Sequence, residues 1–256
     1  MSKGNPMREY KPLKTKKGRD NTGLFLLEGE KFVNEIPSDW DVERIILSSS
    51  FAATLCDISQ YKSRAPVETV RDSLFNSLAD TVSPQGIMAV VKQKRWQLQD
   101  IITPNGFILI GEELNDPGNI GTLIRTAAAA GASGVILSQG SGDIYNPKVL
   151  RAAAGAVFRL PVVANIKLTD AIPQLKTAGY AIYAAHLQGE ILPYDLDLCT
   201  QFCWLVGNES HGLTDEATAL ADELVRLPMA SGVESLNASV AGGVLLYEAL
   251  RQRIRS

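Results

Sequence analysis

Short apolar runs recur along the second half of this chain of 256 residues, and most are followed by a polar loop and a segment with helical spacing. The runs lie at 107–111, 134–137, 180–185, 202–206 and 224–227. Helical spacing is found around 147–156, 169–178, 215–221 and 237–253, and a further helix is expected to begin near Asn119. Apolar strands that alternate with helices are typical of an open, mostly parallel sheet covered on both faces. Ligands of such sheets bind beyond the carboxyl ends of the strands.

The first half predicts a smaller α/β domain. Short strands are expected at 24–27, 44–47, 67–70 and 86–92, and helices at 28–36, 51–59 and 72–79. The polar segment 93–105 is the best candidate for a linker. We therefore expect two domains, at residues 1–98 and 99–256.

Composition narrows the class of protein. With 45% hydrophobic and 21% charged residues, the chain can form one large or two modest cores. No apolar run approaches the ~20 residues that cross a bilayer, and no secretory signal follows the first basic residues. Cys56, Cys199 and Cys203 are too few for a disulfide framework or a closed zinc site. A cytoplasmic protein without a bound metal is the expectation.

Charge is divided unevenly along the chain. Residues 1–98 carry 15 Lys and Arg against 12 Asp and Glu, a balance of +3; the remaining residues carry 10 against 16, a balance of −6, which together give the net charge of −3. The first twenty residues hold seven basic and two acidic side chains. This segment, 1–20, is predicted either to be a basic arm that grips phosphates or to be a solvated, poorly ordered terminus.

The first polar loop runs from Asn115 to Arg125. Pro117 and Gly118 favour a turn, and Asn119 is expected to cap the helix that follows. Free N–H groups at that helix start predict an anion site. Arg125 lies among apolar neighbours about two turns later and needs either a carboxylate or a substrate phosphate as its partner. A capped helix with a structural ion pair is the alternative interpretation.

Two further polar loops follow strands. Gly207 comes directly after an apolar run and allows a close approach of backbone or ligand. Ser210 and His211 do not make a serine hydrolase, because the G-x-S-x-G elbow is missing. In the third loop, Ser235 or Asn237 opens the last helix and is expected to cap it. His186, Cys199 and Cys203 are predicted to pack in the core.

The order and residues of the three loops resemble the SpoU (TrmH) family of RNA ribose 2′-O-methyltransferases, in the SPOUT superfamily. The first motif is Asn119-Ile120-Gly121-(x3)-Arg125, and the second is Gly207-Asn208-Glu209-(x2)-Gly212. The third joins Leu227-Pro228-Met229 to Ser235-Leu236-Asn237-(x)-Ser239. The similarity covers roughly residues 106–250. More weakly, Leu27-Glu28-Gly29-Glu30 and Ser83-Pro84-Gln85-Gly86 resemble the RNA-binding domain of the rRNA-modifying members.

This resemblance implies S-adenosylmethionine (SAM) as methyl donor, RNA as substrate, a homodimer and a trefoil knot in the C-terminal domain. Knots are almost absent from protein folds, so that expectation rests on the resemblance alone. The cofactor-binding residues that it implies are Gly207, Asn208, Leu227, Met229 and Leu236. The catalytic residues that it implies are Arg125, Asn119, Glu209, Ser235 and Asn237.

The matching arginine is often held to activate the hydroxyl in this family. A guanidinium is a poor base, so we expect Arg125 to clamp the phosphate beside the target ribose and stabilise the developing alkoxide, while water or a phosphate oxygen takes the proton. Asn119 and Glu209 are expected to orient Arg125 or the RNA. Ser235 and Asn237 are expected to fix the loop beside the methyl donor.

Alternative functions stay open at this point. The extra N-terminal domain and the basic segment favour 23S rRNA over tRNA as the substrate. A protein of the same fold that binds RNA without catalysis is a second possibility. A nucleotide-binding enzyme acting on small molecules is a third, which is disfavoured because residues 140–145 lack the third glycine of a dinucleotide fingerprint.

Overall fold

The computed structural model describes residues 6–232 and 235–255. The chain divides into two compact units. The N-terminal unit holds the residues up to Lys94 together with Tyr145–Leu150, and the C-terminal unit holds Arg95–Ile144 and the residues from Arg151 onward. The break lies at the start of the polar segment in which a linker is predicted.

The N-terminal unit is built on a four-stranded sheet in the order β1-β4-β2-β3. Its strands are β1 (Leu24–Glu28), β2 (Val42–Ser48), β3 (Val67–Val70) and β4 (Ile87–Lys92). Only β2 and β3 are parallel; β4 runs antiparallel to both of its neighbours. The helices are α2 (Glu30–Glu35), α3 (Ser49–Thr54), α4 (Ser59–Lys62) and α5 (Asp72–Leu78). All four predicted strands are present, and so are the helices expected at 28–36 and 72–79; the helix expected at 51–59 ends early as α3, and the separate short helix α4 begins at residue 59.

The basic N-terminal segment is folded, and not a poorly ordered terminus, over the part of it that the structure describes. A 3₁₀ helix, η1 (Pro6–Lys14), and helix α1 (Lys16–Thr22) fold onto the sheet. Met7, Tyr10 and Leu13 are buried in a core cluster with residues of β2, β4 and α5. The apolar side chains recur every third residue, which matches the 3₁₀ repeat and turns one face of η1 inward. Lys3 lies outside the described residues.

The C-terminal unit is a six-stranded parallel sheet in the order β10-β8-β9-β5-β6-β7. Its strands are β5 (Phe107–Gly111), β6 (Gly134–Ser138), β7 (Val162–Ile166), β8 (Ala181–Ala185), β9 (Phe202–Val206) and β10 (Glu223–Val225). Every residue of β5, β6 and β9 is buried, as expected for strands covered on both faces. The fold class predicted from the sequence is confirmed, and β7 is the strand that it missed.

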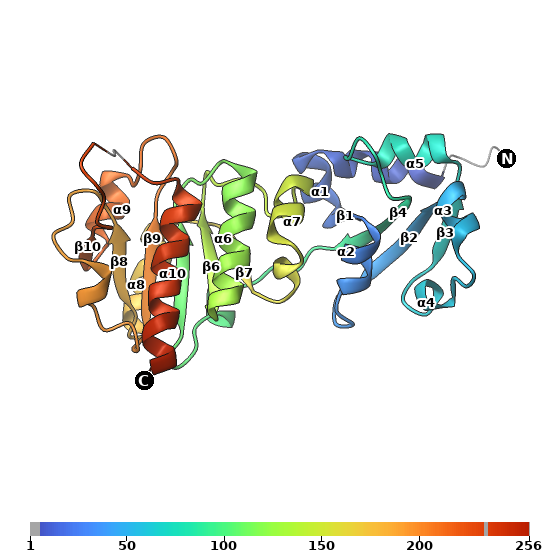
Figure 1. The fold of residues 1–256 in the computed structure, drawn as a ribbon. Coiled ribbons are helices and arrows are strands. Elements are labelled where there is room, and N and C mark those ends of the chain that lie inside the picture. The colour runs from blue at the N-terminus through green and yellow to red at the C-terminus, as the bar shows by residue number, and fades with distance from the viewer. Residues whose placement is uncertain (1–5, 233–234, 256) are drawn as a thin grey trace. The chain divides into compact units, whose positions relative to one another are not determined.

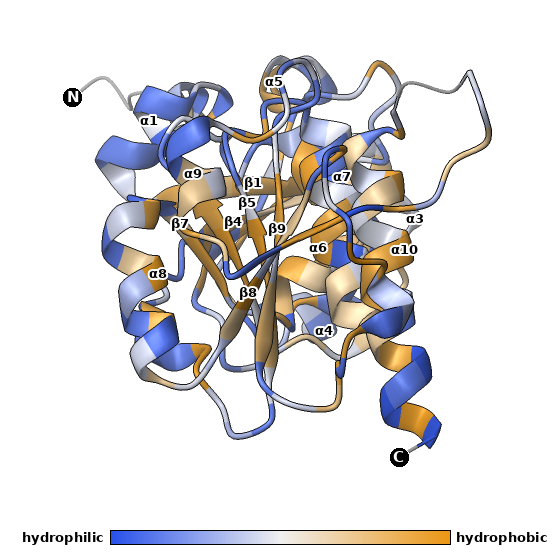
Figure 2. Cartoon of the chain, turned by 90° about the vertical axis from the view of Figure 1, so that its left-hand side faces the viewer, coloured by the Kyte–Doolittle hydropathy of each residue, from blue (hydrophilic) through white to orange (hydrophobic). Residues whose placement is uncertain are grey.

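Helices cover both faces of this sheet. The longer helices of this half of the chain are α6 (Pro117–Ala130), α7 (Pro147–Ala153), α8 (Leu168–Thr177), α9 (Asp215–Ala219) and α10 (Ala238–Arg255). Short 3₁₀ turns lie at η2 (Leu98–Asp100), η3 (Ala156–Phe158) and η4 (Pro193–Asp195). In Figures 1 and 2, α6 and α10 lie side by side on one face, and α8 and α9 on the other. The strands between them are the most apolar layer of the unit (Figure 2).

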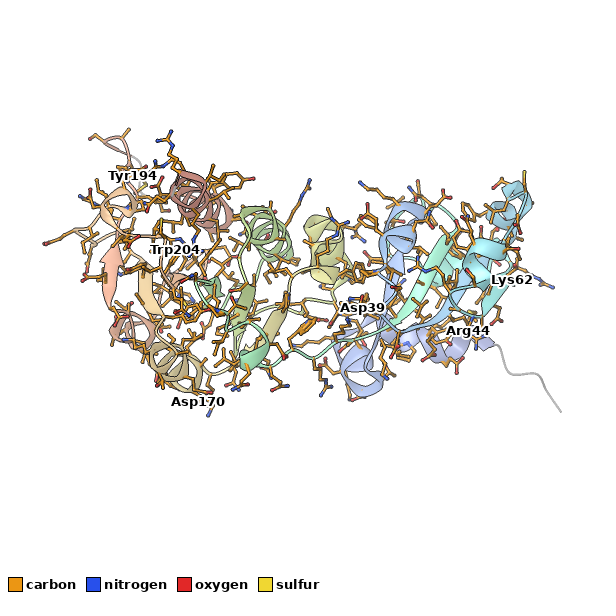
Figure 3. All side chains as sticks on the ribbon, turned by 90° about the horizontal axis from the view of Figure 1, so that it is seen from below. Asp39, Arg44, Lys62, Asp170, Tyr194 and Trp204 are labelled. Carbon is orange, nitrogen blue, oxygen red and sulfur yellow. The ribbon has the colours of Figure 1, made fainter. Side chains whose placement is uncertain are left out.

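Packing of α10 on α6 requires a small residue. A Cβ atom at Gly242 would lie 2.4 Å from a Leu123 methyl group, so glycine lets the two helices approach closely. Trp204 of β9 is fully buried inside the unit, whereas Tyr194 and Asp170 lie at its surface (Figure 3). Within the described ranges, no helix has the length and apolar character needed to span a bilayer. The knot implied by the resemblance stays a prediction.

Candidate functional site

Loops from three adjacent strands meet at one edge of the larger sheet. Residues 186–189 follow β8, 207–213 follow β9, and 226–232 follow β10. These strands are neighbours and parallel, so their carboxyl ends and the loops after them lie together. A cavity of about 450 Å³ opens between the three loops and the start of α10.

The cavity gathers most of the residues predicted for the site. All five cofactor-binding candidates line it, namely Gly207, Asn208, Leu227, Met229 and Leu236. Glu209 and Ser235, from the catalytic set, line it as well. Arg125, Asn119 and Asn237 are outside the described lining. The second and third predicted loops therefore share one cavity, and the first is linked to it by hydrogen bonds from Asn115, Asp116 and Asn119 to Glu209.

The loop after β9 closes tightly because of Gly207. A Cβ atom there would lie 2.3 Å from the carbonyl carbon of Gly212 and 2.4 Å from the amide nitrogen of Leu213, far inside the ~3.5–4.0 Å of van der Waals contact. Asn208 and Gly212 then form an antiparallel bridge, with both N···O distances at 3.0 Å. The side-chain amide of Asn208 donates to the carbonyl of Glu113 at 2.6 Å. This frame holds residues 209–211 in place.

The cavity wall suits a flat ring with polar edges. Val206, Leu227, Met229 and Leu236 supply apolar surface. In the part of the chain that the structure describes, the backbone N–H groups of Leu227, Met229 and Leu236 donate to no backbone carbonyl. Small-molecule sites combine such walls with a few polar groups in volumes of roughly 300–1,000 Å³. The residues present therefore fit SAM, while the described residues contain no group of three His, Cys, Asp or Glu placed to hold a metal ion.

The prediction that Asn119 caps its helix is wrong. Helix α6 begins at Pro117, and the carboxylate of Asp116 accepts from the backbone N–H of Asn119 at 2.8 Å. Asn119 is instead buried in the first turn, where its side-chain amide donates to Glu209 at 3.0 Å. Glu209 also accepts from the backbone N–H groups of Asn115 and Asp116 at 3.4 Å. The carboxylates of Asp116 and Glu209 thus already occupy the start of α6. This helix end is therefore not the free anion site that the sequence predicts.

Arg125 and Asn237 have different surroundings. Arg125 is exposed on α6 and has no hydrogen bond or ion pair within the described chain, so no carboxylate satisfies it. Its guanidinium is open to an external anion. Asn237 is a helix cap, since its Oδ1 accepts from the backbone N–H and the hydroxyl of Ser239 at 2.9 and 2.7 Å. The capping interpretation of Asn237 thus agrees with the structure.

Sequence reasoning missed two histidines and a glutamate. His211 lines the cavity, and its Nε2 lies 3.5 Å from Oε2 of Glu113. His186, predicted to be in the core, lines the cavity too, and its Nδ1 accepts from the backbone N–H of Gln188 at 3.2 Å. The one available signal was that Glu113, His186 and His211 each stand just after an apolar strand of the parallel sheet.

Comparisons with known proteins match both halves of the chain. A family model described as the SpoU rRNA Methylase family matches residues 106–247. A second model, described as the MRM3-like substrate binding domain, matches residues 5–89. The two matches fall on either side of the break between the compact units.

Individual relatives cover almost the whole chain. The chain is 32% identical to a 23S rRNA (guanosine(2553)-2′-O)-methyltransferase, RlmP, of Bacillus subtilis, with 96% of each chain covered. The structure of the SpoU methyltransferase AviRb of Streptomyces viridochromogenes with AdoMet is similar with a TM-score of 0.88, at 28% identity and 97% coverage of both chains. An AdoMet-bound rRNA methyltransferase of Sinorhizobium meliloti is similar with a TM-score of 0.86, at 30% identity, covering 98% of this chain and 96% of that one.

Proposed function

This chain belongs to the SpoU rRNA methylase family, and we propose that it transfers the methyl group of SAM to a ribose 2′-hydroxyl of 23S rRNA. The observation that carries the proposal is the convergence of all five SAM-binding candidates on one cavity beside Glu209. The named activity of the B. subtilis relative and the AdoMet bound to the Streptomyces relative support it.

The cavity would hold SAM through its apolar walls and free backbone groups. Leu227 and Leu236 would flank the adenine, and the backbone N–H groups beside them would read its polar edge. Gly207 would allow the loop to close on the ligand without a side chain in the way. When bound, SAM supplies a methyl group activated by a positively charged sulfur.

Arg125 would act on the RNA side of the site. Its guanidinium is permanently charged, exposed and without a partner in the described part of its own chain, so it would clamp the phosphate next to the target ribose. It would also stabilise the negative charge that develops on the ribose oxygen. Asn119 and Glu209 tie α6 to the cavity loop and would hold Arg125 in register with the methyl donor. Ser235 and the cap at Asn237 would fix the loop before α10.

We assign residues 1–98 to substrate binding and residues 99–256 to methyl transfer. The N-terminal segment supports the first assignment, since its buried face anchors it and leaves Lys11, Lys16 and Lys17 exposed. Lysines held on a folded surface bind phosphates with less loss of entropy than lysines on a mobile arm. Because rRNA and tRNA share this backbone chemistry, the preference for rRNA rests on the relatives.

The proposal extends to a homodimer in the cytoplasm. Val240, Val244 and Tyr247 are 52%, 40% and 52% exposed. Their spacing of four and three residues puts them on one face of α10, where they make an apolar stripe. A second copy of the chain would cover this stripe. Light scattering should give a mass of twice 27.7 kDa, and Val244→Glu should lower it toward that of one chain.

A labelling experiment tests the activity. Total RNA from cells that lack this protein is incubated with the full-length chain and SAM carrying a tritiated methyl group. We expect label in 23S rRNA at a ribose 2′-oxygen. Label confined to tRNA would favour a tRNA methyltransferase, and RNA binding without any label would favour a non-catalytic RNA-binding protein.

An Arg125→Ala variant tests the site. Loss of one group that stabilises an oxyanion lowers rates by about 10²–10³-fold, so we expect a fall of this size with SAM affinity retained. Lys176→Ala is the matched control, because Lys176 is a charged residue of α8, on the opposite face of the sheet, and pairs with Asp222. A full methylation rate in Arg125→Ala would refute the assigned role.

A further inference from the structure

We propose that His211 accepts the proton of the ribose 2′-hydroxyl during methyl transfer and that Glu113 positions its ring. This inference rests on the proposed function and names the proton acceptor for that same site. It replaces the water or phosphate oxygen that sequence reasoning leaves in this role.

His211 lies at the cavity in which we propose that SAM binds. It lines the cavity together with Ser235 and Met229, and its side chain is 51% exposed, so a substrate can reach it. The bridge between Asn208 and Gly212 closes the loop around it. The imidazole therefore stands on a fixed frame rather than on a free loop.

Glu113 is held in an unusual conformation that turns it toward His211. Its φ of 48° lies in the left-handed region, which side chains other than glycine rarely adopt. Its N–H donates to the Ser138 hydroxyl at 2.8 Å, and its carbonyl accepts from the side-chain amides of Asn208 and Asn115 at 2.6 and 2.9 Å. Strain of this kind persists only where the surroundings fix the backbone, and it concentrates at functional sites.

The contact between Glu113 and His211 determines which ring nitrogen is free. Oε2 of Glu113 lies 3.5 Å from Nε2, and catalytic hydrogen bonds often shorten when substrate binds. A carboxylate at Nε2 favours the tautomer with the proton on Nε2, which leaves the lone pair of Nδ1 as an acceptor. Glu113 would also stabilise the imidazolium that forms, as a carboxylate does in catalytic triads.

The step balances without another reactant. The hydroxyl O–H bond breaks and its proton moves to Nδ1 of His211. The oxygen lone pair forms the new O–CH₃ bond while the methyl–sulfur bond breaks and its electron pair stays on sulfur. The products are the 2′-O-methyl ribose, the neutral thioether and an imidazolium paired with Glu113.

The other polar side chains near the cavity are less suited to this task. Glu209 already accepts hydrogen bonds from the Asn119 side chain and two backbone N–H groups, so both of its carboxylate oxygens already have donors within the protein. Nδ1 of His186 already accepts from the backbone of Gln188, and among the described residues no carboxylate pairs with its ring. Arg125 cannot take up a proton.

The test measures single-turnover methyl transfer by the full-length chain on 23S rRNA purified from cells that lack this protein. General-base groups contribute about 10²–10⁴-fold. We expect His211→Gln to lower the rate within that range while SAM binding and the melting temperature stay near those of the wild type. Added imidazole should restore part of the rate to His211→Ala. Glu113→Gln should lower the rate less, because it removes the orienting charge and leaves the base in place.

The pH profile separates proton transfer from a structural role. The described cavity lining holds three titratable side chains, His186, Glu209 and His211, and Glu113 faces His211 from the loop after β5. The wild-type rate should fall at acidic pH, because a protonated imidazole has no lone pair left to accept the hydroxyl proton. His211→Gln should abolish this acid limb, and His186→Gln, the control with the other histidine, should keep it.

The outcomes are distinguishable. A His211→Gln enzyme with the wild-type rate, or one that keeps the acid limb, overturns the inference but leaves the methyltransferase intact. A wild-type chain that labels no RNA overturns the proposed function itself.

Discussion

Replacing Gly207 by alanine should damage the SAM site through one methyl group. The new Cβ atom would lie 2.3 Å from the carbonyl carbon of Gly212 and 2.5 Å from its oxygen. Carbon atoms pack at ~3.5–4.0 Å, so the loop after β9 must move by about 1 Å or more. Both contacts are with backbone, so no rotamer change can relieve the overlap.

The magnitude follows from the cost of overpacking. Inserting a methyl group into a tight site costs about 1–3 kcal/mol. If the loop opens in the free protein and must close again around the ligand, the SAM dissociation constant rises by about 5- to 150-fold. The same energy, expressed as lost stability, lowers the melting temperature by roughly 2–4 °C per kcal/mol for a chain of this size.

Calorimetry with SAM gives the dissociation constant, and a thermal melt gives the stability. Gly131→Ala is the matched control, because Gly131 ends α6 with a positive φ of 80° and has no atom within 4 Å of the position that a Cβ would take. It should cost stability and leave SAM affinity unchanged. A Gly207→Ala protein that binds SAM as tightly as the wild type would refute the reasoning.

Three further predictions concern single side chains. Asn119→Ala removes the side-chain amide that donates to Glu209. Hydrogen bonds to charged groups contribute about 1.5–3 kcal/mol, so the single-turnover rate should fall about 10- to 150-fold. An unchanged rate would contradict the role of the bond between Asn119 and Glu209 in holding the site together. Hydrogen bonds from Arg251, opposed by burial, hold the pKa of Glu248 below its ordinary value. Glu248 therefore stabilises the fold above the ordinary carboxyl pKa, and this stabilisation is lost as pH falls through its lowered pKa. Between about pH 3 and 6, the melting temperature should fall less steeply with decreasing pH for Glu248→Gln than for the wild type. Equal slopes of melting temperature against pH speak against this role. The indole N–H of Trp204 is buried and has no hydrogen-bond partner in the described chain, and such a group destabilises the fold by about 1–3 kcal/mol. Trp204→Phe removes this N–H, so it should lower the free energy of unfolding by far less than the roughly 3–5 kcal/mol typical of a large-to-alanine change. A denaturant titration measures this free energy.

Strand prediction succeeded where burial is complete. Strands β5 and β9 are apolar at every position, and their bounds agree with those predicted. Strand β7 was missed because it lies at the sheet edge, where Ala164 and Asn165 are exposed and Asn165 has a positive φ of 60°. An edge strand buries too little to leave a continuous apolar run.

Local signals were present for two features that sequence reasoning missed. Asp116 followed by Pro117 is a typical start of a helix, because proline at the first position needs no N–H partner. Because the sequence analysis favours Asn119 as the helix cap, the predicted start of α6 lies later in the chain than the observed one. In the first segment, the basic side chains hid the apolar spacing of Met7, Tyr10 and Leu13 that anchors η1.

The arrangement within the cavity could be predicted only in part. Parallel strands bring their carboxyl ends together, and this alone explains why Gly207 and Leu227 share a cavity. The pairing of His211 with Glu113 depends on a positive φ at Glu113 and on hydrogen bonds from distant residues. Such a pair leaves no periodic or local pattern in a single sequence.

Strand β9 is inserted between β5 and β8, two strands that precede it in the chain. While the ribosome is still adding residues near 200, both of those strands lack the neighbour they will later acquire and offer open edges to other nascent chains. For β5 the interval is long: the partner of Phe107 in the finished ladder is Phe202, so roughly 95 residues are added before its open edge can pair, and such long-range contacts form slowly. Fragments that stop before β9 should therefore aggregate readily, and holdase chaperones are expected to bind them.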